Sequence, residues 1–296
     1  MAVKVSIIVA SFNYEKYIAE TLSSIQNQTF TDFEVLVVDD GSKDRSIEII
    51  NSFVQSDSRF TLLTHPQNQN CGLQKTLELG LKQASGEWVT FLESDDVWTK
   101  DCLEKRLQAL NTQKEVGVLY NDIEPLVMSG ADAGWFYSYA PRVFRKVSSS
   151  QTPADLSRDI FYENLIPTFS CVMVRKSLLE ACQWDTPIAR WLDWYLWIQV
   201  LQNTKVLFVA NKLTYWRLHA KSWNYKKSIV SYYKEYSLFR KKLSQLFTPI
   251  FLKAKDRSKI RLINRSAMYF LVLRFIAIVQ YEGIGKSIKK VIKRLI

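Results

Sequence analysis

The chain is poor in cysteine and histidine, with four cysteines and two histidines among 296 residues. No two cysteines form a CxxC pair, so their spacing indicates neither a disulfide framework nor a zinc site and favours a reducing compartment. The N-terminus lacks the basic region, apolar stretch and cleavage site of a secretory signal. We therefore expect a cytoplasmic protein.

Uncharged apolar stretches are scarce as well. Residues 262–281 are apolar but include Arg265 and Arg274, and an arginine near the centre of a spanning helix is costly. We therefore do not expect a transmembrane span. Because 47% of the residues are hydrophobic, the chain can still bury a substantial core, and its length allows one large domain or two ordinary ones.

Acidic residues are almost missing from the C-terminal region. Residues 1–211 hold 19 Lys and Arg against 26 Asp and Glu, whereas residues 212–296 hold 21 against 3. In residues 284–295 the apolar side chains fall on one helical face and the basic ones on the remainder, a pattern typical of an interfacial amphipathic helix. We expect residues 222–296 to form a helical basic region that contacts an anionic membrane surface, as in a peripheral membrane protein. The alternatives are a helix packed on the rest of the protein and a nucleic-acid-binding region, although no nucleic-acid module is recognisable and we expect no nucleic acid partner.

Apolar runs alternate with helical patterns in the first half of the chain. Continuous apolar strands separated by helices predict an α/β fold with a mostly parallel sheet flanked by helices. Strands are predicted at residues 5–10, 33–38, 60–63, 87–92, 116–120, 170–174 and 206–210. Helices are predicted around residues 17–25, 45–53, 73–84, 178–179 and 190–202, and residues 124–150 are expected to be irregular.

Polar side chains follow three of the predicted strands, at Ser11-Phe12-Asn13, Asp39-Asp40 and Asp95-Asp96. In parallel sheets ligands bind beyond the carboxyl ends of the strands, so we expect these clusters to form one site. The packed carboxylates of residues 93–96 are costly unless a cation neutralises them. Carboxylate oxygens suit Mg²⁺ or Mn²⁺, which usually also hold substrate phosphates. The alternative is a turn in which Asp95 or Asp96 caps the next helix.

Several motifs together resemble inverting family 2 glycosyltransferases with the GT-A fold, over roughly residues 3–220. They are Ser6–Asn13, Gln28–Glu34, Val37–Ser42, Gly86–Trp88, Glu93–Asp96 and Asp193–Trp197. The resemblance implies a Rossmann-like catalytic domain over residues 1–221, with a nucleotide-sugar-binding half (1–122) and an acceptor half (123–221).

The resemblance also implies the residues that bind the nucleotide. Phe12 would stack on a uracil ring, and Asp40 would accept a hydrogen bond from the base, which favours uridine or thymidine over cytidine. Alternatively, Phe12 belongs to the core, Asp40 caps a helix and Lys75 is an ordinary exposed helix residue. The full set of expected nucleotide-binding residues is Ala10, Ser11, Phe12, Asn13, Glu15, Asp40, Lys75 and Asp95.

The metal site and the catalytic base follow from the same resemblance. Asp96 and Asp95 match the metal-binding pair for Mn²⁺ or Mg²⁺, and His219 would contact the metal or the diphosphate unless it is a surface histidine. The usual first acid of this motif is Asp, and Glu93 stands in its place, so the longer side chain weakens the expectation of a direct metal contact from residue 93.

Asp193 corresponds to the base that takes the acceptor proton. Its flanking tryptophans would raise its pKa or stack on sugar rings, whereas Leu192 replaces a residue that is usually acidic. The alternative is that Asp193 is a helix cap or an exposed group.

The expected function is transfer of a sugar from a UDP-sugar donor to a hydroxyl of a glycan or lipid-linked acceptor, in surface polysaccharide or glycoconjugate synthesis. Because Glu93 and Leu192 depart from the family pattern, the alternative is a catalytically inactive nucleotide-sugar-binding or scaffold protein of the same fold. A second alternative is a polyanion-binding protein that acts through its basic C-terminal region.

Overall fold

The structure is a computed structural model that describes most of residues 4–219 and a few positions beyond them. The residues left out within this span are 112, 132, 135, 138–151, 162, 185–187 and 189, and the later described residues are 235, 238, 239, 241–243, 245 and 246. The chain divides into two compact units, Met1–Ile160 with Asn164–Phe239, and Phe161–Glu163 with Arg240–Ile296. The expected boundary near residue 222 and the expected amphipathic helix lie outside the described residues. The central sheet belongs to the first unit.

Strands and helices alternate through the first half of the chain, as predicted. The elements in chain order are β1 (Val5–Ser11), α1 (Ile18–Gln26), β2 (Phe33–Asp39), α2 (Ser46–Ser56), β3 (Phe60–Thr64), α3 (Leu73–Gln83), β4 (Trp88–Phe91), β5 (Val97–Trp98), α4 (Cys102–Leu110), β6 (Val116–Val127), a 3₁₀ turn η3 (Phe169–Cys171), β7 (Val172–Arg175), α6 (Lys176–Glu180), α7 (Leu192–Val200) and β8 (Lys205–Leu218).

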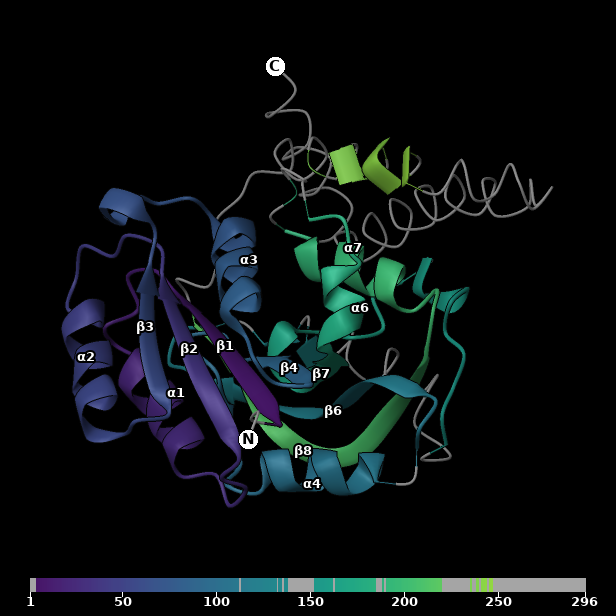
Figure 1. Cartoon of the computed structure of the whole chain (residues 1–296), viewed down its shortest axis with the longest axis horizontal. Helices are drawn as coiled ribbons and strands as arrows, with labels where there is room; N and C mark the ends of the chain where they lie inside the picture. The colour runs from purple at the N-terminus through teal and green to yellow at the C-terminus, as the bar shows by residue number, and fades with distance from the viewer. Residues whose placement is uncertain are drawn as a thin grey trace. The chain divides into compact units, whose positions relative to one another are not determined.

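Within the described residues the strands form one sheet in the order β3-β2-β1-β4-β7-β6-β8-β5. The neighbours β3, β2, β1 and β4 are parallel, and so are β6 and β8. Strand β7 is antiparallel to β4 and β6, and β5 is antiparallel to β8. The expected α/β architecture is therefore confirmed, with antiparallel strands confined to the second half of the sheet. Figure 1 shows how the long β8 curls beneath the other strands.

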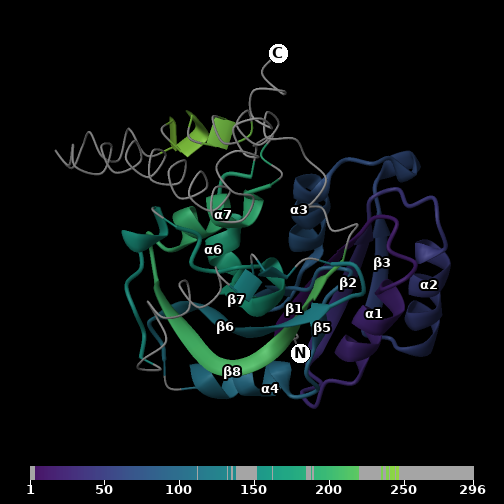
Figure 2. The same ribbon diagram turned by 180° about the vertical axis from the view of Figure 1, so that it is seen from behind.

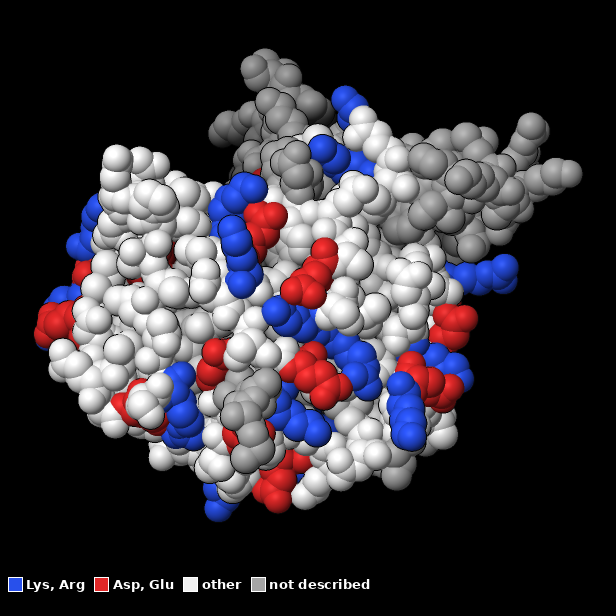
Figure 3. Space-filling model, viewed as in Figure 1, with Lys and Arg blue, Asp and Glu red and all other residues white. Residues whose placement is uncertain are grey.

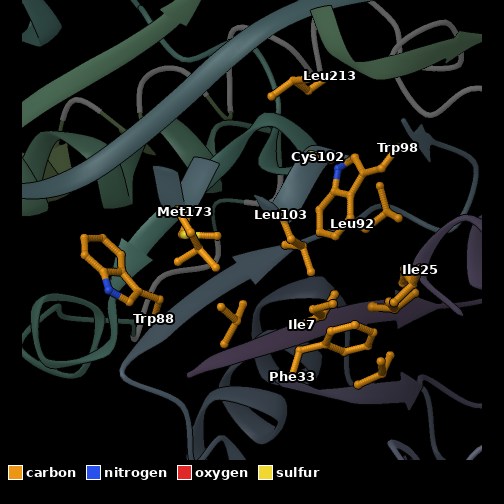
Figure 4. Close-up of a cluster of buried hydrophobic side chains, with 14 of the residues drawn as sticks. Ile7, Ile25, Phe33, Trp88, Leu92, Trp98, Cys102, Leu103, Met173 and Leu213 are labelled. Carbon is orange, nitrogen blue, oxygen red and sulfur yellow. The ribbon is translucent and has the colours of Figure 1, made fainter. Parts of the chain in front are cut away.

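The alternation of side chains along β1 assigns the helices to the two faces of the sheet. Val5, Ile7 and Val9 point to the face covered by α1, α2 and α4 and join one hydrophobic cluster with Ile25 (Figure 4). Ile8 points to the other face, where α3 packs so closely that a Cβ on Gly80 would lie 2.6 Å from an Ile8 methyl. Figure 2 shows α3 and α7 on this second side. Both faces are covered, which explains why these strands are apolar throughout.

Two strands are longer than their sequences indicate. Strand β6 continues through Pro125 to Val127, into the stretch expected to be irregular. Among the described strands, residues 122–127 pair with β8 alone, so Pro125 stands at an edge of the pairing, where proline is tolerated. Strand β8 continues past the polar pair Asn211-Lys212, where the pairing register with β6 shifts at Asn121 and Asp122. A polar bulge of this kind interrupts the apolar pattern without ending the strand.

Acidic and basic side chains are interspersed over the described surface seen in Figure 3. Many are paired, as in Arg175 with Glu87 at 2.5 Å and Lys176 with Glu180 at 3.3 Å. The excess positive charge of the sequence therefore comes from the C-terminal region. Among the described residues, the structure has no helix that combines the length and the apolar character needed to cross a membrane.

Candidate active site

A cavity of about 460 Å³ lies beyond the carboxyl ends of β1, β2 and β4. Segments far apart in the sequence line it: the ends of these strands, the start of α3, the residues before β7, the start of α7 and the end of β8. The residues that line it include Ser11, Phe12, Tyr14, Asp40, Glu93, Asp95, Thr168, Arg190, Asp193 and Arg217. The expectation that three strand ends share one site is thus met by the geometry.

The turn after β2 aims Asp40 at the cavity. The buried Asp39 carboxylate accepts hydrogen bonds from the Gly41 and Ser42 backbone N–H groups, at 3.1 and 2.8 Å, and so closes the turn. Gly41 has φ +84°, and a Cβ there would lie 2.7 Å from the Asn68 carbonyl oxygen, so only glycine fits. The Asp40 carboxylate accepts from the N–H groups before α3, Cys71 at 2.6 Å and Gly72 at 2.9 Å. It does not cap α2, which excludes that alternative.

Three of the expected nucleotide-binding residues at the end of β1, namely Ala10, Ser11 and Phe12, line the cavity. Phe12 is 42% exposed, so its ring is not part of the core. The Ser11 hydroxyl is buried and has no hydrogen-bond partner among the described residues. The Ala10 carbonyl oxygen accepts a hydrogen bond from the Ser94 hydroxyl.

Three other expected nucleotide-binding residues do not line the cavity. Asn13, with φ 59°, accepts from the Lys43 N–H at 2.7 Å and stabilises the loop. The Glu15 carboxylate accepts from the Arg45 N–H at 3.1 Å, at the start of α2. Lys75 is 58% exposed and lies 3.0 Å from Glu78 on α3, as its alternative interpretation held. Nucleotide contact by these three residues stays a prediction.

The four residues after β4 separate into cavity-lining and buried positions. Asp95 lines the cavity, and its Oδ2 lies 3.0 Å from Nε2 of His219. Glu93 also lines it and accepts a 2.7 Å hydrogen bond from the Thr168 hydroxyl. His219 is buried rather than a surface residue, and its ring packs against Tyr17 with centroids 4.8 Å apart. Asp95 and His219 thus bring a carboxylate oxygen and a ring nitrogen together, and of the two residues Asp95 lines the cavity.

Asp96 is not placed as expected. Its side chain is fully buried and does not line the cavity. Oδ2 accepts a 2.5 Å hydrogen bond from the Ser170 hydroxyl, and Oδ1 accepts one of 2.9 Å from the Arg217 N–H. These bonds hold η3 and the end of β8 against the acidic cluster. Asp95 rather than Asp96 therefore faces the cavity, and metal binding by Asp96 stays a prediction.

Electrostatics at the acidic cluster favour a cation. Burial, and then the nearby Asp95 charge, raise the pKa of Glu93 to about 7. Burial is also the main cause of the raised pKa of Tyr14, followed by the charge of Asp95. Both effects report a site where negative charge accumulates with little solvent. A divalent ion beside Asp95 would relieve that repulsion.

Asp193 lies at the start of α7 and lines the same cavity as Asp40. Burial raises its pKa to about 6, although hydrogen bonds from the Trp194 N–H and the Asn164 amide partly offset this effect. The Asn164 bond is 2.8 Å long and ends on Oδ2. Asp193 is thus neither a simple cap nor a solvated surface group.

Three tryptophans flank Asp193 in the sequence: Trp191 at the N-cap of α7, and Trp194 and Trp197 within the helix. Trp194 and Trp197 are buried, and the Trp194 indole N–H donates to the Ile160 carbonyl oxygen at 2.5 Å. Phe239 packs on Trp191 and Trp194, with ring centroids 5.7 and 4.9 Å apart. None of the three tryptophans lines the cavity, and stacking on sugar rings stays a prediction. Their contribution is the low polarity around Asp193.

Arg217 links the acidic cluster to α1. Its guanidinium donates to the Asp95 carbonyl oxygen and to the Glu20 carboxylate, both at 2.6 Å, and lies over the Tyr17 ring. Sequence reasoning did not assign Arg217, Thr168 or Asn164 to the site. Arg217 lies two residues before His219, which sequence reasoning did assign to the site, whereas Thr168 and Asn164 carry no local signal because their partners are distant in the sequence.

The comparisons agree with this geometry. Residues 6–182 match the model of Glycosyl transferase family 2, more than half of the chain, and the chain therefore belongs to this family. Solved structures share the fold: the 1–349 fragment of S. aureus TarS in complex with UDP-GlcNAc has a TM-score of 0.61 at 22% identity, covering 81% of this chain and 66% of that one. The mannosyltransferase PcManGT from Pyrobaculum calidifontis, in complex with GDP-Man and Mn²⁺, has a TM-score of 0.58 at 17% identity, covering 100% of this chain and 88% of the other. The expected GT-A fold is confirmed.

Two curated relatives differ in how much of their length is matched. An uncharacterized glycosyltransferase of Haemophilus influenzae is 42% identical over 103 residues, 35% of this chain and 40% of the relative. The Escherichia coli protein WfgD, a UDP-Glc:alpha-D-GlcNAc-diphosphoundecaprenol beta-1,3-glucosyltransferase, is 28% identical over 202 residues, 68% of this chain and 71% of its own length. The match to the first relative thus spans less than half of that protein.

Proposed function

We propose that this chain is a metal-dependent, inverting glycosyltransferase that uses a UDP-sugar donor. The observation that carries the proposal is one cavity lined by an exposed aromatic ring, Phe12, and by three carboxylates at separate strand and helix ends, Asp40, Asp95 and Asp193. Its volume lies in the range of small-molecule sites. A nucleotide-sugar needs a surface for the nucleobase, a cation for the diphosphate and a catalytic base near the sugar. The residues that line the cavity offer a candidate for each role.

The nucleobase of the donor would lie between Phe12 and Asp40. Phe12 offers an exposed ring for stacking, and the hydroxyl of Ser11 is buried without a partner. Oδ1 of Asp40 accepts from the Cys71 and Gly72 N–H groups and Oδ2 accepts from the Gly72 N–H, which leaves a second lone pair on Oδ2 for an N–H of the nucleobase. An acceptor at this position favours uridine or thymidine over cytidine, whose ring nitrogen carries no hydrogen there.

Asp95 and His219 would hold the metal, with Glu93 beside them. Carboxylate and imidazole ligands suit Mn²⁺, and Mg²⁺ is also bound through carboxylates. When bound, the ion supplies Lewis-acid stabilisation of the charge on the departing diphosphate. The Arg217 guanidinium holds the backbone of Asp95 at 2.6 Å, which orients this carboxylate toward the cavity.

Asp193 would act as the catalytic base. With its pKa raised to about 6, it is mostly ionised at pH 7 yet is a stronger base than an ordinary aspartate. It would take the acceptor hydroxyl proton while the acceptor oxygen bonds to the anomeric carbon and the carbon–diphosphate oxygen bond breaks on the opposite face. Attack from that face inverts the configuration.

The acceptor is proposed to be a hydroxyl of a glycan or of a lipid-linked sugar in surface polysaccharide synthesis. The relative WfgD is named for a diphosphoundecaprenol-linked acceptor, which supports this class. Contact of residues 222–296 with an anionic membrane surface stays a prediction, because those residues lie mostly outside the described part of the chain.

The proposal is tested by a thermal-shift screen of UDP-, GDP-, dTDP- and CDP-sugars with and without Mn²⁺. We expect a UDP-sugar to raise the melting temperature most, and only with Mn²⁺. Hydrolysis of that donor should then be lost in Asp193→Asn and Asp95→Asn. Binding without any turnover by the unaltered protein would identify it as a nucleotide-sugar-binding protein instead, and no response to any nucleotide would overturn the proposal.

A further inference from the structure

Three metal-ligating side chains meet beside the proposed base subsite. A carboxylate oxygen of Asp40, a ring nitrogen of His65 and the sulfur of Cys71 all lie within 4.8 Å of one another. Nε2 of His65 is 3.6 Å from Oδ1 of Asp40. The residues come from the end of β2, the loop after β3 and the approach to α3, so no sequence spacing typical of zinc sites reveals them.

The backbone fixes these residues before any ligand binds. Cys71 donates its N–H to Asp40 at 2.6 Å, and Asn68 donates its N–H to the His65 carbonyl oxygen at 2.9 Å. The loop between His65 and Cys71 lies against Gly41, where no Cβ would fit. Asp40 and His65 are buried, whereas Cys71 is exposed and its side chain can turn. A site with two fixed ligands and one adjustable ligand requires little reorganisation.

The donor set selects a particular class of cation. Thiolate, imidazole and carboxylate are zinc ligands with bonds of about 2.0–2.3 Å in tetrahedral geometry, and Nε2 of His65 and Oδ1 of Asp40, at 3.6 Å from each other, are close enough to bind one such ion. Mg²⁺ and Mn²⁺ prefer oxygen ligands, so this cluster differs in selectivity from the Asp95–His219 pair. One thiolate and one carboxylate would neutralise a divalent ion, which limits the cost of holding it in a partly buried place.

We propose that Asp40, His65 and Cys71 form a site for a thiophilic divalent cation such as Zn²⁺, overlapping the base subsite. Binding releases the Cys71 thiol proton to solvent and uses a neutral imidazole, with the fourth position open to water. Nε2 of His65 exchanges its 3.2 Å contact with the Thr76 hydroxyl for the metal, while that hydroxyl keeps its 3.0 Å bond to the Gly72 carbonyl oxygen. Since Asp40 cannot serve the metal and a nucleobase together, the cation excludes the nucleotide; this consequence rests on the proposed function, whereas the metal site does not.

Cobalt(II) tests the site directly, because a thiolate ligand gives a charge-transfer absorption band that oxygen and nitrogen ligands do not. Metal-free protein titrated with Co²⁺ should develop this band at one equivalent, and Zn²⁺ should abolish it. Cys71→Ala, a change at an exposed position, should remove the band and weaken binding at this site by more than about tenfold. Cys182→Ala removes a thiol outside the cluster and should leave the band intact. Absence of the band, or its persistence in Cys71→Ala, overturns the proposal.

Uridine tests the overlap without the metal-binding phosphates of a nucleotide. Added to the Co²⁺-loaded protein, saturating uridine should diminish the thiolate band, and Zn²⁺ should weaken uridine binding to the unaltered protein but not to Cys71→Ala. A band unchanged by uridine that binds alongside the metal would overturn the overlap. Failure of metal-free protein to bind uridine would count against the proposed function and leave the Co²⁺ result to decide the metal site separately.

Discussion

Replacing Asn164 with alanine should shift the pH dependence of turnover upward by about one pH unit. The Asn164 amide donates a 2.8 Å hydrogen bond to Oδ2 of Asp193 and lowers the pKa that burial raises to about 6. Hydrogen bonds to charged groups are worth about 1.5–3 kcal/mol, and about 1.4 kcal/mol corresponds to one pKa unit. At the lower end of that range, Asp193 would titrate near pH 7 in the variant.

The sign follows from the role of Asp193 as a base. Turnover requires the ionised carboxylate, so kcat/KM falls as the pH drops through the pKa. At pH 6 the unaltered protein should keep about half of its plateau rate, and Asn164→Ala about a tenth of its own. Above pH 8.5 Asp193 is ionised in both proteins, so their two rates should approach each other.

The assay is UDP release from the donor identified by the binding screen, followed from pH 5 to 9 with Mn²⁺ present. Asn111→Ala, which removes an exposed amide after α4, is the matched control and should keep the original profile. Circular dichroism shows whether the variant is folded. An acidic limb that stays in place or moves downward in folded Asn164→Ala would refute the assignment of Asp193 as the base under the control of Asn164.

Three further predictions follow from the acidic cluster and the end of β1. Asp95→Asn should abolish Mn²⁺-dependent UDP binding in calorimetry with little change in stability, whereas Asp96→Asn should lower the free energy of unfolding by about 2–3 kcal/mol in urea denaturation; the reverse pattern would return the metal to Asp96. Phe12→Ala should weaken UDP binding by about 1–3 kcal/mol, the usual value of base stacking, and an unchanged Kd would remove Phe12 from the site. Because the pKa of Glu93 rises from its usual 4.5 to about 7 on folding, the folded state binds a proton that the unfolded chain releases. Stability without metal should therefore fall by up to about 3 kcal/mol between pH 4.5 and 7, and Glu93→Gln should flatten this slope; an equal slope in both proteins would contradict the burial of Glu93.

The sequence predicted the fold well where one periodicity decides the structure. Strands β1, β2 and β4 are apolar throughout because helices cover both faces, and their polar ends therefore marked the cavity. The prediction that Asp40 and Asp193 belong to one site agrees with the geometry, since each directly follows or begins a regular element. The sequence predicts β6 and β8 to be shorter than they are. Pro125 and Asn211-Lys212 look like strand ends in the sequence, but strand pairing in the tertiary structure tolerates them.

The local sequence does not tell which of Asp95 and Asp96 faces the cavity. Its outcome depends on the Ser170 hydroxyl and the Arg217 N–H, which reach Asp96 from 74 and 121 residues away. The same reason explains Glu15 and Lys75, whose charges are satisfied by neighbours on α2 and α3 rather than by a ligand. A charged residue near a strand end signals a site only when no such partner takes its charge.

The position of manganese in a crystal grown with UDP tests the central claim most directly. The account predicts one anomalous peak within coordination distance of the Asp95 carboxylate and the His219 ring, bridged to the diphosphate, with uracil between Phe12 and Asp40 and with Asp193 facing the open side of the diphosphate. A peak coordinated by Asp96, or uracil bound away from Asp40, would contradict it.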